Sequence, residues 1–393
     1  MTMLRSLALG TAAATLALSP VAAAQDDAAP LPSAHGYEPQ DSVEQGLWYE
    51  MAQQEKLIAE SKLVIDDPEL NQYVRGVLCR SVGEERCAAT RIYIVRVPYF
   101  NASMAPNGMM LVYSGLLLRM RNEAQLAAVL GHEFTHFEQQ HSLRLFKSAR
   151  KKTNLLSFLG FVPIPYFAMA SQFALIGSVF SFNRDMEREA DAGSIEELVR
   201  GGYDPAQASV VWRQLGAEMD ATAKERDHKS RKNKNGGMFG THPRSTDRME
   251  TLAELARAQA LTEPGVTNAA EYRAALGDWW PKLIDDQVRM QDFGASEYLL
   301  DSLALDGWSG QLLHAKGELY RARGNDGDFD KAAEFFRSAM TYDDAPALAW
   351  RGLGLALMKQ GRREEGQAML REYLEREPDA DDAALLAMMA GES

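Results

Sequence analysis

Apolar residues recur at helical spacing from residue 43 to about residue 79, which predicts helices in this stretch. The pattern then changes, because residues 91–97 are rich in β-branched and other apolar side chains in partial alternation, as in a strand. Two more apolar runs, 100–104 and 109–113, flank the turn sequence Pro-Asn-Gly at 106–108. A strand followed by a β-hairpin is therefore predicted between residues 91 and 113.

Helical spacing returns after residue 113. Ser114 can cap one helix and Asn122 a second one, because both side chains accept hydrogen bonds from the free N–H groups of a first turn. A charged amphipathic helix is predicted at 184–200, ended by Gly-Gly-Tyr-Asp-Pro at 201–205. The expected fold class is α+β, mostly helical, with one small sheet.

A second architecture begins near residue 278. Large, small and helix-ending side chains recur there at the places that a tetratricopeptide repeat reserves for them. One unit resembles that repeat family closely and contains Trp350, Leu353, Gly354, Leu357, Gly366, Leu370, Tyr373 and Pro378. A preceding unit has Gly317, Tyr320, Ala332, Phe336 and Ala339, and a weaker one begins near Ala295 and Leu299. An α-helical repeat domain is therefore predicted at 278–390.

The length of 393 residues exceeds that of one typical core and favours two domains. We expect a first domain at 43–265, before the repeats, and a flexible lead-in at 25–42 that is rich in Ala, Asp, Pro and Gln. The formal net charge of -13 argues against nucleic acid as the main partner.

Residues 1–24 have the features of a cleaved signal peptide for export. Arg5 gives a positive start, residues 7–18 are largely apolar, and Ala22 to Ala24 offer a small-residue cleavage site. An uncleaved membrane anchor is the alternative, and it is disfavoured because a membrane span needs roughly 20 apolar residues.

Cysteine usage fits an oxidising compartment. The chain has two cysteines, Cys79 and Cys87, and an even pair close in sequence can form a disulfide after export. Two unrelated thiols are the competing interpretation. The spacing is not the C-x-x-C of a redox site.

Residues 153–183 contain no charged side chain, and Pro163 and Pro165 divide them, which disfavours an unbroken spanning helix. Three roles stay open for this segment: burial beside the active site, a flap or plug over a cleft, or a membrane-contacting surface. A basic run follows later and is predicted to be a solvated loop; it comprises Lys224, Arg226, Lys229, Arg231, Lys232 and Lys234.

The strongest chemical signal is His-Glu-Phe-Thr-His at 132–136. Residues four apart on a helix differ by roughly 40° in azimuth, so His132 and His136 point the same way and can hold one zinc ion. Glu133 lies roughly 100° round the helix, beside the metal, where a carboxylate can take a proton from water. Asn122 and the apolar run after it support a helix through the motif.

A catalytic zinc site needs a third protein ligand. His141 is rejected, because nine residues after His132 it would lie roughly 180° round the same helix, and it is expected at a surface or interface. Glu187, on a later helix, is the better donor. Asp191 lies one turn further and can accept the N–H of a ligating histidine. Glu189 is a rival whose Asp partner would lie on a different face.

Other motifs accompany this one in order: Asn101-Ala102 before a hairpin, a Gly115-Leu-Leu helix, Glu187-x-x-Ala-Asp191, Gly202-Tyr-Asp-Pro205 and Thr241-His242-Pro243 with Arg248. Together with 131–136 they resemble the zinc metallopeptidases typified by HtpX, BepA and the CAAX prenyl endopeptidases. The similarity covers about residues 43–260.

The resemblance implies a zincin-like metalloprotease domain at 43–265 in which Zn²⁺ is held by His132, His136 and Glu187, with Glu133 as general base. It also implies that His242 lies near the zinc, where it either steadies the oxyanion or caps the metal in a resting state. Arg248 would pair with acidic groups such as Asp191. The family's integral-membrane members have clear spanning helices, whereas this chain resembles the soluble exported branch with C-terminal repeats.

From these features we expect a periplasmic zinc endopeptidase that acts on misfolded or unassembled cell-envelope proteins. The polypeptide substrate would extend along residues 100–105, at Asn101 and Ala102, and add its backbone to that edge. The repeats would bind substrate or envelope-assembly machinery. The alternatives are a chaperone or adaptor of envelope assembly with a closed, weakly active zinc site, and a membrane-associated protease that touches lipid through 153–183.

Overall fold

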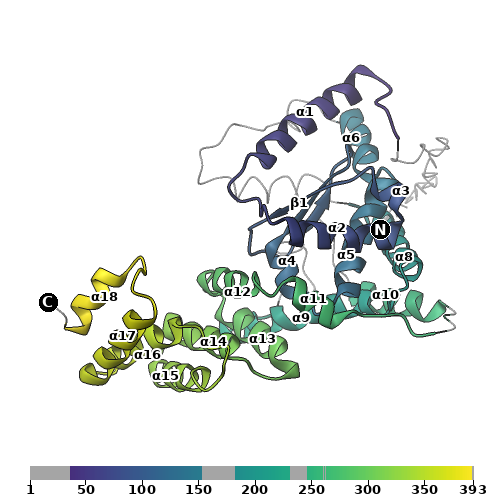
Figure 1. Ribbon diagram of the computed structural model, residues 1–393. Helices are drawn as coiled ribbons and strands as arrows, with labels where there is room; N and C mark the ends of the chain where they lie inside the picture. The colour runs from purple at the N-terminus through teal and green to yellow at the C-terminus, as the bar shows by residue number, and fades with distance from the viewer. Residues whose placement is uncertain (1–35, 153–181, 231–245, 260, 262, 392–393) are drawn as a thin grey trace, which may run out of the picture. The chain divides into compact units, whose positions relative to one another are not determined.

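The computed structural model describes residues 36–152, 182–230, 246–259, 261 and 263–391 (Figure 1). The chain divides into two units, residues 1–32 and 33–393, and the first unit lies outside the described residues. The predicted signal peptide at 1–24 therefore lies outside them as well, and so do residues 153–181 of the uncharged segment. What was predicted for residues 1–24 and 153–181 therefore stays a prediction.

A three-stranded sheet lies at the centre of the first domain. Its order is β1 (Arg91–Val95), β3 (Met109–Tyr113) and β2 (Ala102–Met104). β3 pairs in parallel with β1 and antiparallel with β2, so the predicted hairpin is confirmed. Gly108 in its turn has φ 89°, and a Cβ there would lie 2.3 Å from Ala89 O. Among the described residues β2 pairs with β3 alone, which makes it an edge strand.

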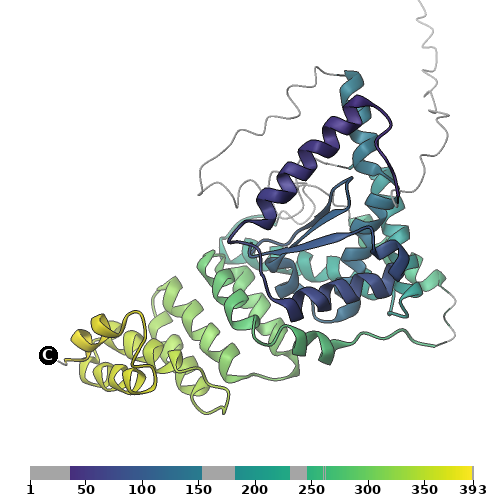
Figure 2. The same ribbon diagram turned by 45° about the horizontal axis from the view of Figure 1, so that its top comes forward.

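The two faces of the sheet pack against different helices, as Figure 2 shows for α1 (Ser42–Ala59) and α2 (Pro68–Val82). Side chains alternate along β3, so Leu111 and Tyr113 pack on α1 and α6 (His141–Lys152). Met110 and Val112 point the other way and join the core of α2 and α5 (Glu123–Glu138). Since both faces are covered, all five β3 residues are buried, as its unbroken apolar run requires.

Six further helices precede the repeats in the described part of the chain. They are α3 (Glu84–Cys87), α4 (Ser114–Arg119), α8 (Arg184–Arg200), α9 (Gln207–Glu225), α10 (Thr246–Ala258) and α11 (Ala269–Ala275). Cys79 of α2 and Cys87 of α3 are joined by a disulfide and both are buried, so the bridged interpretation of the cysteine pair holds in the structure. None of the helices in the described ranges combines the length and apolar character needed to cross a membrane.

The predicted helix caps are partly correct. Asn122 caps α5 through a hydrogen bond that its Oδ1 accepts from Gln125 N at 2.9 Å. The prediction for Ser114 is wrong: Tyr113 occupies the cap position, and the Ser114 hydroxyl donates to Val97 O at 3.0 Å. The reason is that β3 runs directly into α4, so the serine is already inside the first turn and bonds to the neighbouring chain segment.

Helical pairs follow from residue 280 onward. They are α12 (Trp280–Arg289), α13 (Phe293–Leu303), the 3-10 turn η4 (Ala304–Asp306), α14 (Gly310–Arg323), α15 (Asp328–Ala339), α16 (Leu348–Lys359), α17 (Arg363–Arg376) and α18 (Ala383–Ala390). Phe336 explains one small position of the repeat pattern, because a Cβ on Gly317 would lie 2.6 Å from its ring. A Cβ on Gly352, which the pattern did not mark, would lie 2.4 Å from the same ring. Small residues therefore let α14 and α16 pack on the ring of α15, and the repeat pattern predicts the first of these two contacts.

The first repeat helices share a core with the part of the chain that precedes them, since one apolar cluster extends from Ile65 to Leu319. A buried polar network accompanies it. Arg119 on α4 pairs with Glu218 on α9 at 2.6 Å and donates to Gln287 on α12 at 3.0 Å. The sequence offers no spacing rule that predicts such a network.

Candidate active site

Helix α5 carries the two histidines of the motif on one face. The Nε2 atoms of His132 and His136 lie 3.1 Å apart, and both rings are buried. The helix is fixed at its N-terminal end by the Asn122 cap. At Gly131 an added Cβ would lie 3.3 Å from Glu197 Cβ, so the absence of a side chain lets α8 pack closely on α5.

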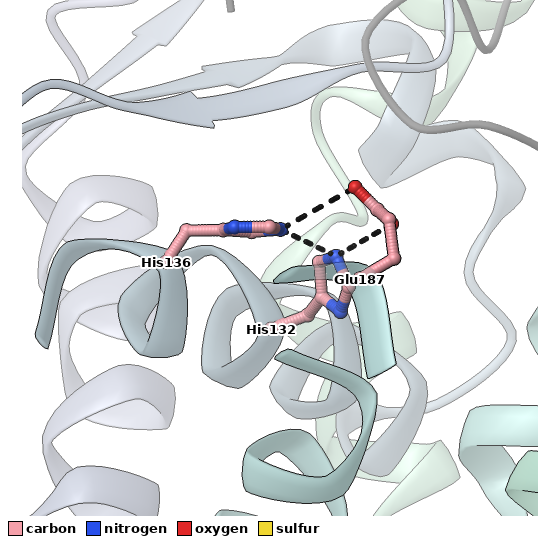
Figure 3. A group of neighbouring side chains, drawn as sticks. All are labelled: His132, His136 and Glu187. Atoms are coloured by element: carbon pink, nitrogen blue, oxygen red, sulfur yellow. Dashed lines mark hydrogen bonds and ion pairs between the residues drawn. The ribbon is translucent and has the colours of Figure 1, made fainter. Parts of the chain in front are cut away.

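Glu187 comes from the first turn of α8 and completes a buried group of three (Figure 3). Its Oε2 lies 3.6 Å from His132 Nε2, and its Oε1 lies 3.7 Å from His136 Nε2. Two ligands of a tetrahedral zinc ion, each 2.0–2.2 Å from it, are about 3.4 Å apart. The three donor separations of 3.1, 3.6 and 3.7 Å are close to that value, so the donor set fits one ion with a position left for another ligand.

Asp191 and Arg248 lie behind this group. Asp191 Oδ1 is 3.2 Å from His132 Nδ1, and both oxygens of Asp191 accept hydrogen bonds from Arg248, at 2.6 and 2.5 Å. Arg248 Nη1 also forms an ion pair with Glu187 Oε2 at 2.8 Å, and its guanidinium lies over the ring of Trp212 at 4.2 Å. Arg248 therefore joins Asp191, which contacts His132, to Glu187, which lies beside both histidines.

These contacts determine the charge of the two residues. Burial alone would raise the pKa of Asp191, but the nearby Arg248 and His132 more than offset that effect and hold the pKa at about 2. Burial alone would lower the pKa of Arg248, yet Asp191 and Glu187 hold it above its ordinary value. Both groups are therefore charged at neutral pH although they are buried.

The prediction that His141 lies at a surface or interface is wrong, because its side chain is fully buried. Helix α5 ends at Glu138, and Gln140 has φ 52°, so the chain turns and His141 begins the separate helix α6. The predicted position of His141, roughly 180° round the helix from His132, assumed one continuous helix and does not apply after that turn. His141 Nδ1 lies 2.7 Å from His136 Nδ1, on the ring edge away from Glu187.

Glu189, the rival carboxylate, faces away from the group of three. Its Oε2 lies 2.8 Å from His141 Nε2 and 2.9 Å from Arg144 Nη2.

Phe182 stacks on His136 with ring centroids 3.8 Å apart. Phe182 belongs to the uncharged segment 153–183 and is buried, so at this one position the structure agrees with the first of the three roles considered for that segment, burial beside the active site.

A cavity opens beside His132 and Glu133 and encloses about 520 Å³ of empty space, part of it open to solvent. Asn101 and Ala102 line it from the sheet side. Its other walls are largely apolar and include Phe100, Ala128, Val129, Ala208, Val211, Trp212 and Leu252. The cavity therefore lies between the start of β2 and the motif residues His132 and Glu133.

The structure thus brings eight of the nine predicted site residues to one place: His132, Glu133, His136, Glu187, Asp191, Arg248, Asn101 and Ala102. His242 lies outside the described residues. Their functional roles remain predictions. Trp212 and His141 were missed, because no motif marks the first and the second was placed on the wrong helix.

Comparisons with known proteins agree with the motif analysis. The profile of peptidase family M48 matches residues 65–256, and that of a tetratricopeptide repeat matches residues 325–390. The chain is 26% identical over 214 residues to a putative beta-barrel assembly-enhancing protease of Vibrio cholerae, which is 51% of this chain and 42% of the relative.

Two further relatives are similar over shorter segments. The mitochondrial metalloendopeptidase OMA1 of Schizosaccharomyces pombe is 29% identical over 195 residues, which is 49% of this chain and 55% of the relative. The beta-barrel assembly-enhancing protease of Escherichia coli is 30% identical over 155 residues, which is 36% of this chain and 32% of the relative. The matched regions span between about a third and a little over half of these relatives' lengths.

The resemblance inferred from the ordered motifs is confirmed by these matches. Residues 65–256 of this chain form a domain of peptidase family M48, and a tetratricopeptide repeat follows it at 325–390.

Proposed function

We propose that the protein is a zinc-dependent endopeptidase. One observation carries the proposal: three donor atoms of His132, His136 and Glu187 converge within 4.8 Å of one another, beside a cavity that Glu133 lines. Two imidazoles and one carboxylate are the donor set of a catalytic zinc site. The family match and the protease or metalloendopeptidase names of the three relatives support the same activity.

In this proposal His132, His136 and Glu187 hold the ion. One oxygen of Glu187 can face the metal while Arg248 holds the other, since the two oxygens have different neighbours. A bound zinc ion supplies Lewis acidity, which polarises a carbonyl oxygen and makes water easier to deprotonate at neutral pH.

Glu133 acts as the general base. Its carboxylate takes a proton from the attacking water, and the resulting carboxylic acid gives that proton to the leaving amine as the C–N bond breaks. The position on the cavity wall next to His132 suits this role, because a substrate carbonyl in the cavity would lie within reach. For His242 we keep the proposal of oxyanion stabilisation or capping, which rests on the family resemblance alone.

Substrate lies along β2. Tyr113 N donates to Asn101 O and Ala105 N donates to Met109 O, so residues 101 and 105 face β3 with their backbone groups. Backbone direction alternates along a strand, and the N–H and C=O groups of Ala102 and Met104 therefore point to the open edge. An extended peptide can pair with these groups while one of its side chains enters the apolar cavity.

The substrate class we propose is misfolded or unassembled proteins of the cell envelope, met in the periplasm, with the repeats binding substrate or assembly machinery. Three observations support it: the signal-like residues 1–24, the Cys79–Cys87 disulfide, and relatives whose names refer to beta-barrel assembly. Paired repeat helices commonly form extended binding surfaces for other polypeptides.

A chaperone or adaptor with a closed zinc site is the second candidate. It is favoured by the burial of the site, where His132 is 7% and Glu187 4% exposed, and by the approach of Arg248 Nη2 to within 3.1 Å of His132 Nε2. In a strain that lacks the protein, rescue of envelope defects by the Glu133→Gln variant would favour this candidate.

The experiment that tests the proposed activity compares wild type, Glu133→Gln and Glu187→Ala for zinc content and casein digestion. We expect Glu133→Gln to keep one zinc ion per chain and to lose digestion, and Glu187→Ala to lose both. Digestion by Glu133→Gln at the wild-type rate would overturn the assignment of the base.

A further inference from the structure

The two histidines of the motif are held in different ways. His132 Nδ1 lies 3.2 Å from a carboxylate oxygen of Asp191, whereas His136 Nδ1 lies 2.7 Å from another imidazole, Nδ1 of His141. The chain of contacts continues from His141 Nε2 to Glu189 Oε2 at 2.8 Å. His136 therefore reaches a carboxylate through an intervening ring.

The direction of these hydrogen bonds follows from the chemistry of the ligand. The inference rests on the proposed function, in which Nε2 of His136 binds the metal and must carry a lone pair. The proton of the neutral His136 ring is then on Nδ1, and it can only be donated to Nδ1 of His141. The acceptor role leaves the His141 proton on Nε2, which points to the acceptor oxygen of Glu189.

The opposite direction would be incompatible with ligation. If His141 Nδ1 donated, the neutral His136 ring would carry its proton on Nε2. That proton would point at His132 Nε2 and Glu187 Oε1, which lie 3.1 and 3.7 Å away. No lone pair would then be available for a metal ion, so the hydrogen-bond direction determines whether the ring can be a ligand.

The hydrogen-bond relay from His136 through His141 to Glu189 is held in place by the side chains around it. His141 is fully buried and begins helix α6, directly after the turn at Gln140, where φ is 52°. Phe182 stacks on the His136 ring and contacts His141 at 6.1 Å between centroids. Arg144 Nη2 donates to the same oxygen of Glu189, Oε2, at 2.9 Å. Each ring of the relay is therefore constrained by a neighbour other than the metal.

We propose that His141 is a positioning residue that, anchored by Glu189, fixes the orientation and the Nδ1–H tautomer of His136 and thereby raises the zinc affinity of the site. Hydrogen-bond partners of this kind orient metal ligands, and their loss commonly costs 10- to 100-fold in metal affinity. No ligand role is assigned to His141 itself.

The test is the zinc affinity of the purified full-length protein, measured by competition with a chromogenic chelator. His141→Leu should bind zinc about 10- to 100-fold more weakly than wild type. His141→Asn should recover most of the affinity, because its Oδ1 can accept from His136 Nδ1–H at the place of the imidazole nitrogen. Glu189→Gln should have a smaller effect, since its amide oxygen can still accept from His141.

His314→Leu is the matched control. His314 is a partly buried histidine packed against Phe336 in the repeats, so its replacement also removes a packed imidazole but is remote from the metal site. We expect its zinc affinity to equal that of wild type. Histidine ¹⁵N NMR of the metal-free wild-type protein should show the Nδ1–H tautomer for His136.

An unchanged zinc affinity of folded His141→Leu would overturn the relay, and so would an Nε2–H tautomer of His136 in the metal-free protein. If His141→Leu does not fold, the zinc affinity of His141→Asn and the tautomer of His136 decide whether His141 accepts a hydrogen bond from His136. A wild-type protein that binds no stoichiometric zinc would refute the proposed function instead, so the two failures are distinguishable.

Discussion

Gly193 on α8 lies directly against Thr135 on α5: a Cβ added to the glycine would be 2.4 Å from the threonine Oγ1. The two helices approach this closely in the middle of the motif, and Glu187 lies on α8 less than two turns before the contact. The convergence of a distant carboxylate with two histidines therefore depends on a missing side chain.

Gly193→Ala tests this dependence. The added methyl group must push α8 away from α5, and we expect a loss of about 1–3 kcal/mol in the free energy of unfolding together with weaker zinc binding. Gly216→Ala on α9 is the control, since no atom lies within 4 Å of its Cβ position, and it should stabilise the protein by about 0.5–1 kcal/mol. Equal zinc affinity in Gly193→Ala and wild type would contradict the packing argument.

Arg248→Met should destabilise the metal-free protein by about 3–5 kcal/mol, because two buried carboxylates lose their partner. Urea unfolding at pH 7 measures the effect. Arg188→Met is the control, since Arg188 pairs with Asp185 on an exposed part of α8 and should contribute less than about 1 kcal/mol. A loss in Arg248→Met no larger than in this control would contradict the buried network.

The pH dependence of stability is a separate consequence of the Asp191–Arg248 pair. The pKa of Asp191 is about 2 in the folded metal-free protein and 3.8 as its ordinary value. Because the folded value is the lower one, ionised Asp191 stabilises the protein above about pH 4, and this contribution is lost as the pH falls from 4 towards 2. Without Arg248, burial raises the pKa, so acid unfolding of Arg248→Met should begin at a higher pH than in wild type.

Ala102→Pro tests the open edge of β2. Proline removes the N–H group that points away from β3 but leaves the Asn101 and Ala105 bonds to β3 intact. Losing one hydrogen bond of about 0.5–1.5 kcal/mol should raise KM roughly 2- to 10-fold at unchanged zinc content. Ala102→Gly keeps the N–H group and serves as the control; a wild-type KM for the proline variant would exclude backbone pairing at this position.

Arg119→Met removes the centre of the buried network that joins α4, α9 and α12. Glu218 would be left buried without its partner, and we expect a cost of about 3–5 kcal/mol in urea unfolding. Arg96→Met is the comparison, because its ion pair with Asp286 also reaches α12 but is partly exposed, and such pairs contribute less than about 1 kcal/mol. A similar loss of unfolding free energy in both variants would show that burial does not determine how much these two ion pairs contribute to stability.

Much of the site could be predicted from the sequence because its signals are local. The spacing of His132 and His136 on one helix, the Asn122 cap and the turn at 106–108 each depend on a few consecutive residues. Glu187 was found through its own motif. Gly317, Gly354 and Gly366 of the repeats were found because the pattern recurs along the chain, whereas Gly352 was not.

What the sequence did not reveal depends on turns and on distant contacts. His141 was misplaced because a single positive φ at Gln140 ends α5 and redirects the chain. The cavity wall formed by Trp212 and the network of Arg119, Glu218 and Gln287 join segments that are far apart in sequence. No local sequence pattern predicts contacts between such distant segments, so these contacts can be identified only when the packing of whole helices is known.

The most direct measurement for the central claim is anomalous diffraction at the zinc edge from crystals of the full chain grown with zinc. We expect one ion bound by Nε2 of His132, Nε2 of His136 and a carboxylate oxygen of Glu187. An ion bound elsewhere, or one that leaves Glu187 uncoordinated, would contradict it.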